Sequence, residues 1–152
     1  MKTTYQAFTL IESLLVLLIV SIFFAVPTLV VGKSVETIEI ARFLDRFEKS
    51  LLVTQQEAIL TKEPTKIHQL YYDEAAVDFQ FANGKKILPR LTVPEKLTMT
   101  RTTKLEIIFK AETGTNSSLQ IIAFEWPEKK QKIRYKFLFG KGHYDKEIVP
   151  LN

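Results

Sequence analysis

Residues 8–31 read FTLIESLLVLLIVSIFFAVPTLVV, and this stretch decides the fold. It is apolar or small throughout, apart from Glu12 and the helix breaker Pro27. A helix of this length is about 36 Å long at 1.5 Å per residue, and the hydrocarbon core of a bilayer is about 30 Å thick. The stretch therefore predicts a transmembrane helix over residues 8–31.

The distribution of charge separates this stretch from the rest of the chain. Charged residues make up 25% of the 152 residues, yet the first 31 residues contain only Lys2 and Glu12. A positive charge before the span and a large domain after it predict residues 1–7 inside the cell and the domain outside. We therefore expect a single-pass protein of the cytoplasmic membrane.

Two interpretations of the span follow from its composition. A cleaved secretory signal explains the charged start, but its apolar run is usually only about 7–15 residues long and ends at an A-x-A-like site. A plain signal anchor explains the length and orientation. It does not explain Glu12, because a central acidic residue costs about 2.5–3.5 kcal/mol on insertion, unless Glu12 lies at the membrane edge.

The residues at the start of the span supply a third interpretation. Residues 6–14 read QAFTLIESL, so that the small residue Ala7 precedes Phe8, and Glu12 is the fifth residue counted from Phe8. This string closely resembles the processing site of type IV prepilins and pseudopilins, in which the small residue is usually Gly. The resemblance implies that a prepilin peptidase cuts between Ala7 and Phe8 and methylates the new amine of Phe8.

The resemblance also implies that Phe8 and Glu12 act in assembly. A carboxylate within an apolar helix needs a partner, or it becomes protonated. Cleavage creates one, because the cationic amine of Phe8 in a neighbouring subunit can meet Glu12. Such a pair would fix the axial stagger between subunits, as a single polar core residue fixes the register of a coiled coil.

The helix is expected to continue beyond the span as an amphipathic arm over residues 32–63. Pro27 removes a backbone hydrogen bond and Gly32 adds flexibility, which predicts a kink between the two parts. Charged residues, Glu48 among them, occupy one face of the arm, and Pro64 ends it. The other face is an apolar stripe at helical spacing: Ile40, Leu44, Phe47, Leu51 and Ala58, thickened by Phe43, Leu52 and Ile59.

Residues 64–152 are predicted to form a β-rich head. Val77, Phe79 and Phe81 alternate with polar residues, which indicates a half-buried strand, and Asn83-Gly84 favours a tight hairpin. Further strands are expected at residues 67–72, 86–88, 97–101, 105–110, 119–126 and 132–139. Short strands with close turns predict a mainly antiparallel sheet covered by the arm, hence an α+β fold.

The sequence contains no pattern that indicates catalysis. His68 and His143 lack the paired spacing of metal ligands. The absence of cysteine excludes a thiol nucleophile and every cysteine-ligated metal site. We therefore expect neither an enzyme nor a bound cofactor or metal.

The head is basic, with 15 Lys and Arg against 10 Asp and Glu over residues 64–152. Clustered cations are typical of phosphate binding, and Tyr135 and His143 could add stacking faces. Lysines on the solvent side of a strand also protect its edge, and alternation over residues 132–139 favours that interpretation. The candidate DNA contacts are Lys129, Lys130, Lys132, Arg134 and Lys136.

A head of many strands with a single long helix resembles minor pseudopilins more than major fibre subunits. The short leader, the cysteine-free head and the FTLIESL start most resemble the competence pseudopilins of Gram-positive bacteria. This likeness implies a transformation pseudopilus that supports DNA uptake, with prepilin peptidase and other pseudopilins as partners and the cell surface as destination. The alternatives are a minor subunit of another type IV pilus or type II secretion system, a pseudopilin with a DNA-binding head, and an unrelated membrane-anchored enzyme or receptor domain.

Overall fold

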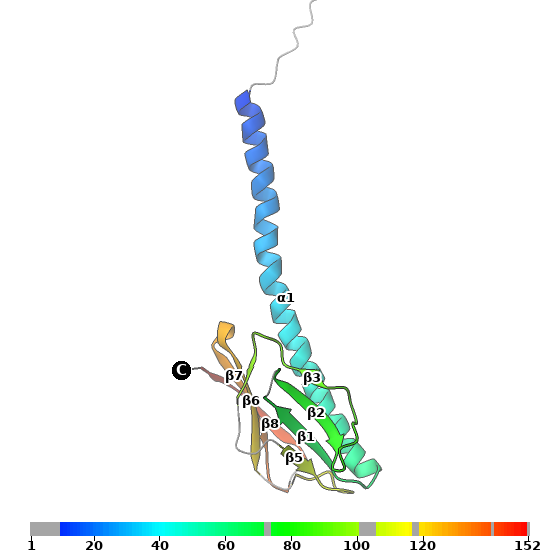
Figure 1. The fold of residues 1–152 in the computed structure, drawn as a ribbon. Helices are drawn as coiled ribbons and strands as arrows, with labels where there is room; N and C mark the ends of the chain where they lie inside the picture. Colours follow the sequence, from blue (N-terminus) through cyan, green and yellow to red (C-terminus); the bar gives the residue numbers. More distant parts are fainter. Residues whose placement is uncertain (1–9, 72–73, 101–105, 117–118, 141, 152) are drawn as a thin grey trace, which may run out of the picture. The chain divides into compact units, whose positions relative to one another are not determined.

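The computed structural model describes residues 10–71, 74–100, 106–116, 119–140 and 142–151, with the backbone alone for residues 25–34. The chain divides into two units, Met1–Ile38 and Glu39–Asn152. The first unit contains the N-terminal part of a long helix, α1 (Leu10–Leu60), and the second contains the rest of α1 and two β-sheets. The predicted α+β class, a helix packed on antiparallel sheets, is confirmed (Figure 1).

Helix α1 is assigned without interruption through Pro27 and Gly32, and the kink expected at these residues stays a prediction. Its end at Leu60 comes before the predicted boundary at residue 63. Lys62 takes the left-handed conformation with a φ of 57°, which is typical of a helix C-terminus, and Pro64 follows. Among the described residues, no helix combines the length and the apolar character needed to cross a membrane.

One four-stranded sheet, sheet A, has the strand order β3-β2-β1-β5 with every pair antiparallel. Its strands are β1 (Thr65–Leu70), β2 (Ala76–Phe81), β3 (Leu91–Thr92) and β5 (Glu106–Phe109). The hairpin turn predicted at Asn83-Gly84 follows β2, and Gly84 has the positive φ of 91° that such turns need. The strand predicted over residues 86–88 is wrong, because Lys86 makes only a single bridge, to Gln80.

The other sheet, sheet B, has the order β4-β6-β7-β8, again antiparallel. Its strands are β4 (Thr98–Met99), β6 (Gln120–Trp126), β7 (Gln131–Phe137) and β8 (Tyr144–Pro150), and the short 3-10 helix η1 (Pro127–Lys129) joins β6 to β7. Strand β7 ends before Phe139, which lies in a turn. Strand β8 was not predicted, because Asp145, Lys146 and Glu147 interrupt any alternation of apolar and polar residues.

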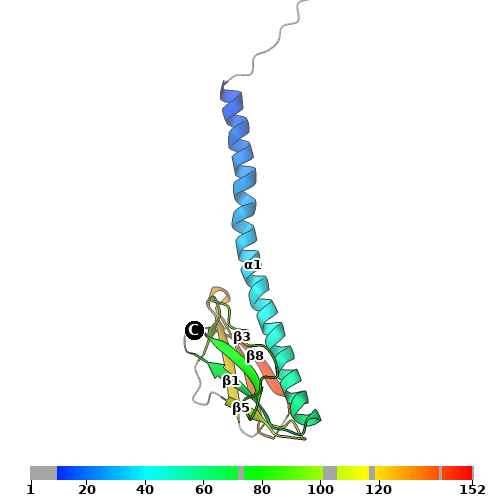
Figure 2. The ribbon, with the colours of Figure 1, turned by 45° about the vertical axis from the view of Figure 1, so that its right-hand side comes forward.

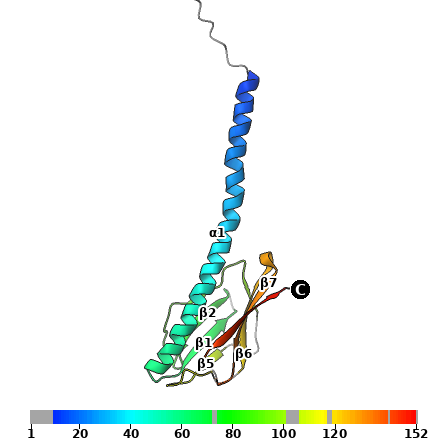
Figure 3. The same cartoon turned by 180° about the vertical axis from the view of Figure 1, so that it is seen from behind.

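The C-terminal part of α1 packs on both sheets and closes one core. Seen from behind, it crosses sheet A, and a view turned by 45° shows the same strands beside it (Figures 2 and 3). The Phe47 ring, fully buried, lies 6.3 Å from the ring of Phe79 on β2 and 5.1 Å from that of Phe124 on β6. The two sheets also meet directly, since the rings of Phe109 and Phe137 are 6.2 Å apart.

The apolar stripe predicted on the arm is confirmed in its centre and wrong at one border. Ile40, Phe47 and Leu51 are at most 2% exposed, as the helical spacing predicts. Leu52 and Ile59, which were expected to thicken the stripe, are 51% and 41% exposed. Leu52 and Ile59 each follow a buried residue by one position, which turns them about 100° around the helix from Leu51 and Ala58.

Leu51 and Leu52 provide a matched pair for testing this core. We expect Leu51→Ala to lower the free energy of unfolding by about 2–5 kcal/mol, because it leaves a cavity. Leu52→Ala should cost less than about 1 kcal/mol, because half of that side chain is already in solvent. Chemical denaturation of the full-length protein, followed by circular dichroism, measures both, and equal losses would contradict this packing.

Candidate functional site

The predicted processing residues Ala7 and Phe8 lie outside the described residues, whereas Glu12 lies in the first turn of α1 and is exposed. Glu12 is the only charged residue between Leu10 and Phe24. The described start of α1 is therefore uncharged apart from this one carboxylate.

The apolar side chains that follow Glu12 are exposed on all sides of the helix. The large ones between Leu10 and Phe24 range from 42% to 80% exposed. Residues 14–20 are all apolar and make about two turns, so they cover the full circumference. The Ser21 hydroxyl donates to the Leu17 carbonyl oxygen at 2.8 Å and needs no outside acceptor. Within its own unit, this part of α1 therefore presents apolar side chains on every side.

On the head, three of the five candidate DNA contacts lie on the solvent side of β7 and face carboxylates. Lys132 Nζ lies 2.8 Å from Glu125 Oε1 on β6, and Lys136 Nζ lies 2.6 Å from Glu147 Oε1 on β8. Arg134 Nη1 is 3.8 Å from the other oxygen of Glu147. The expected alternation is confirmed over residues 132–137, because these cations alternate with buried Ile133, Tyr135 and Phe137, and it is wrong at Phe139, which is 71% exposed. The expectation that the lysines protect a strand edge is also wrong, because β7 lies between β6 and β8.

The two carboxylates of this network remain ionised. Hydrogen bonding from Lys132 lowers the pKa of Glu125, with a further contribution from the Thr100 hydroxyl. Hydrogen bonding from Lys136 lowers the pKa of Glu147 in the same way. The two carboxylates therefore offset two of the three positive charges of β7 locally, and Lys132 and Lys136 would each have to leave a carboxylate before binding a phosphate.

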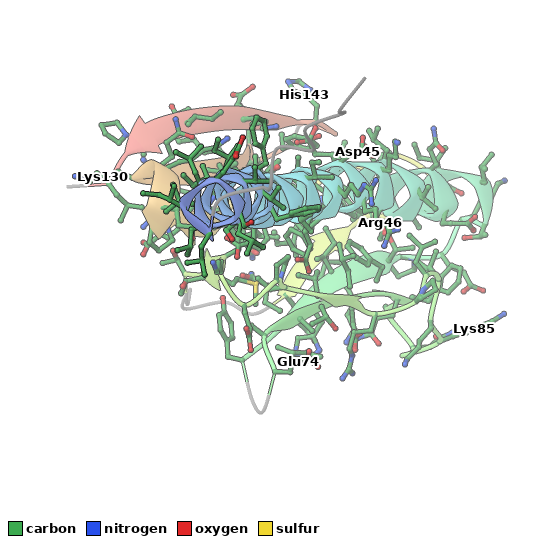
Figure 4. The ribbon with its side chains drawn as sticks, turned by 90° about the horizontal axis from the view of Figure 1, so that it is seen from above. Asp45, Arg46, Glu74, Lys85, Lys130 and His143 are labelled. Carbon is green, nitrogen blue, oxygen red and sulfur yellow. The ribbon has the colours of Figure 1, made fainter. Side chains whose placement is uncertain are left out.

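The other two candidate contacts lie at the turn between β6 and β7. Lys129 Nζ lies 4.2 Å from the centroid of the Trp126 ring, a cation–π distance. Lys130 is exposed in the left-handed conformation, with its backbone N–H donating to the Pro127 carbonyl oxygen. Figure 4 shows Lys130 and His143 on the side of the head where β8 lies, opposite Lys85. The expectation that Tyr135 offers a stacking face is wrong, because its side chain is fully buried.

The outer face of sheet A carries a second set of ion pairs. Asp78 and Arg90 form a bidentate pair with both distances at 2.9 Å, and hydrogen bonding from Arg90 lowers the pKa of Asp78. His68 stands in register between Asp78 and Glu106 on the neighbouring strands. Over the part of the chain that the structure describes, no group of His, Asp and Glu side chains could hold a metal ion.

A contact between α1 and sheet B was not indicated by the sequence. Glu48, expected on the solvent face, accepts hydrogen bonds from the Tyr135 hydroxyl at 2.9 Å and from Lys146 Nζ at 2.6 Å. Burial raises the pKa of Tyr135, and the nearby Glu48 carboxylate raises it further, so the phenol stays neutral and donates. No sequence signal identifies this contact, because its three residues are brought together only by the fold.

Comparison with known proteins does not add to this description. No family model, curated protein or solved structure matches the chain.

The ion pairs of β7 lead to a test of DNA binding by the head. Glu125→Gln combined with Glu147→Gln should free the cations of β7 and strengthen salt-sensitive binding of full-length protein to duplex DNA. Glu95→Gln combined with Glu112→Gln is the control, because it makes the same change in net charge at exposed residues elsewhere. Fluorescence anisotropy at several salt concentrations measures the affinity. Equal affinity of the two double variants would contradict local neutralisation.

Proposed function

We propose that this chain is a minor pseudopilin of a competence pseudopilus that supports DNA uptake. A prepilin peptidase cuts it between Ala7 and Phe8, and it joins other pseudopilins through its N-terminal helix. The observation that carries the proposal is the double character of α1. Its start is apolar and exposed with one carboxylate, Glu12, in the first turn, while its end builds the core of a β-rich head.

The exposed apolar side chains of α1 support a location in the cytoplasmic membrane before assembly. Burying apolar surface stabilises a protein by about 25 cal/mol per Å², so side chains left in water across this stretch carry a large cost. In the sequence the apolar run continues to Val31, which gives the span of residues 8–31 with the head outside. In the fibre, neighbouring helices take the place of lipid and expose the head at the cell surface.

Glu12 gives this assembly its register. An apolar helix has no strongly preferred axial position against its neighbours, because every turn carries similar apolar side chains. One carboxylate that pairs with the Phe8 amine of a neighbouring subunit selects a single stagger, since any other leaves two charges unpaired in an apolar environment. Assembly then depends on cleavage, because the uncut precursor has no amine at Phe8.

The alternative assignments of this chain imply the same architecture and differ in the proteins with which the chain assembles. A minor subunit of another type IV pilus or of a type II secretion system needs the same processed helix and the same kind of head. A DNA-binding head is a weaker candidate, because Lys132, Arg134 and Lys136 already face carboxylates. The proposal therefore assigns the head to contacts within the fibre.

Processing is tested by the mass of the mature chain from cells with and without prepilin peptidase. We expect a chain that begins with N-methylated Phe8 only when the peptidase is present. Ala7→Gly should be cut normally, whereas Ala7→Leu should leave uncut precursor in the membrane, because the site accepts only a small residue. A mature chain that begins near Gly32, or one that keeps Met1 beside an active peptidase, would overturn the proposal.

The role of Glu12 is tested separately by Glu12→Val. The variant should be inserted and cleaved, because removing a carboxylate lowers the cost of insertion, yet it should be absent from isolated pseudopili and should abolish transformation. Glu12→Asp keeps the carboxylate and should retain part of both functions. Normal incorporation of the valine variant would show that no charge pair sets the register.

A further inference from the structure

Two contacts show in which direction α1 runs along sheet B. The ring of Phe43 lies 5.3 Å from that of Phe124, two residues before the end of β6 at Trp126. About three turns later along α1, Gln55 donates to the Gly142 carbonyl oxygen, in the connection between β7 and β8. Strand β6 runs away from that connection, since its first residue pairs with the last residue of β7. The turn between β6 and β7, which contains η1, therefore lies at the end of the head where α1 enters it, the entry end (Figure 1).

The length of chain between the apolar run and the head limits how far the entry end can lie from a membrane. The apolar run ends at Val31, and the unit that contains the head begins at Glu39, eight residues further on. Eight residues reach at most about 29 Å when extended and about 12 Å as a helix, whatever angle the two units adopt. If residues 8–31 span the membrane, as the proposed function requires, the entry end is the part of the head that faces the lipid headgroups.

Two lysines at the entry end carry charges that the fold leaves without a carboxylate. Lys129 and Lys130 are exposed, and among the residues that the structure describes neither forms an ion pair. The adjacent Glu128 pairs with Lys96 at 3.1 Å, and the cations of β7 face carboxylates of their own. With the exposed Glu95 included, these five residues are three cations and two carboxylates, so the turn keeps a net positive charge.

The turn that carries the two lysines is held in one conformation. Lys129 Nζ lies 4.2 Å from the centroid of the Trp126 ring, which is only 5% exposed. Lys130 takes the left-handed conformation with a φ of 49°, and its backbone N–H donates to the Pro127 carbonyl oxygen at 3.0 Å. A charged group that is already positioned loses less conformational entropy when it binds a ligand.

We propose that the turn between β6 and β7 docks on the membrane surface, where Lys129 and Lys130 bind the phosphate groups of anionic phospholipids. Each lysine near an anionic membrane surface strengthens binding about fivefold, and the attraction falls off within a Debye length of about 10 Å at 0.1 M salt. The entry end is the part of the head that the chain holds within reach of this attraction. The contact keeps the head on the membrane before assembly and is lost when the subunit enters the fibre.

The only tryptophan of the chain, Trp126, lies in the proposed contact and reports on it. Full-length protein is reconstituted in vesicles of phosphatidylcholine mixed with phosphatidylglycerol, in which some headgroups carry a nitroxide. The ratio of Trp126 emission without and with the nitroxide measures docking. We expect quenching in these vesicles, and its loss both in phosphatidylcholine alone and at 1 M salt, where the Debye length is about 3 Å.

A matched pair of double variants tests the two lysines. Lys129→Gln combined with Lys130→Gln should lower the ratio of docked to free heads about 30-fold, at about fivefold for each lysine. Lys85→Gln combined with Lys86→Gln is the control, because these lysines are also adjacent and exposed, and Lys85 Nζ lies 5.9 Å from the Phe81 ring centroid. They lie beyond the other end of α1, since the next residue of their hairpin, Ala82, bonds to Pro64, and the control should leave quenching unchanged.

Flotation of the protein with the vesicles after an alkaline wash separates this inference from the proposed function. A chain that does not stay with the vesicles would contradict the membrane span, and the docking with it. A chain that stays inserted, yet is quenched equally in both double variants or equally in phosphatidylcholine alone, would overturn the docking and leave the proposed function intact. Unchanged quenching together with a loss of duplex DNA binding in the Lys129 and Lys130 variant would assign these lysines to DNA instead.

Discussion

The packing of Phe47 against both sheets is the contact on which the head depends. Besides Phe79 and Phe124, its ring meets that of Tyr135 at 5.0 Å, so a single side chain of α1 touches β2, β6 and β7. Each four-stranded sheet has an apolar face that must be covered, and α1 covers both. Sheet A, sheet B and the second part of α1 are therefore one cooperative core.

Polar contacts fix how the elements of this core are oriented. The Thr65 hydroxyl donates to the Thr54 carbonyl oxygen at 2.7 Å and ties the start of β1 to α1. Glu48 ties α1 to β7 and β8 through Tyr135 and Lys146. A buried polar group without a hydrogen-bond partner costs free energy. Each of these contacts therefore favours the arrangement of helix and sheets in which its groups are paired.

The surface chemistry of the head follows from the same arrangement. Antiparallel pairing places carboxylates of β6 and β8 on either side of the β7 cations, so that part of the positive charge of the head is paired on sheet B.

The sequence by itself determined the features that depend on neighbouring residues along the chain. The apolar run, the helical stripe around Phe47, the hairpin at Asn83-Gly84 and the alternation in β7 all follow from local periodicity. Only the tertiary structure decided the division into two sheets, the existence of β8 and the contact of Glu48 with Tyr135 and Lys146. Periodicity indicates which residues share one face of a helix or strand. Which other element packs against that face is decided by contacts between residues far apart in the sequence. For that reason Leu51 and Leu52, adjacent and chemically identical, differ in exposure from 2% to 51%.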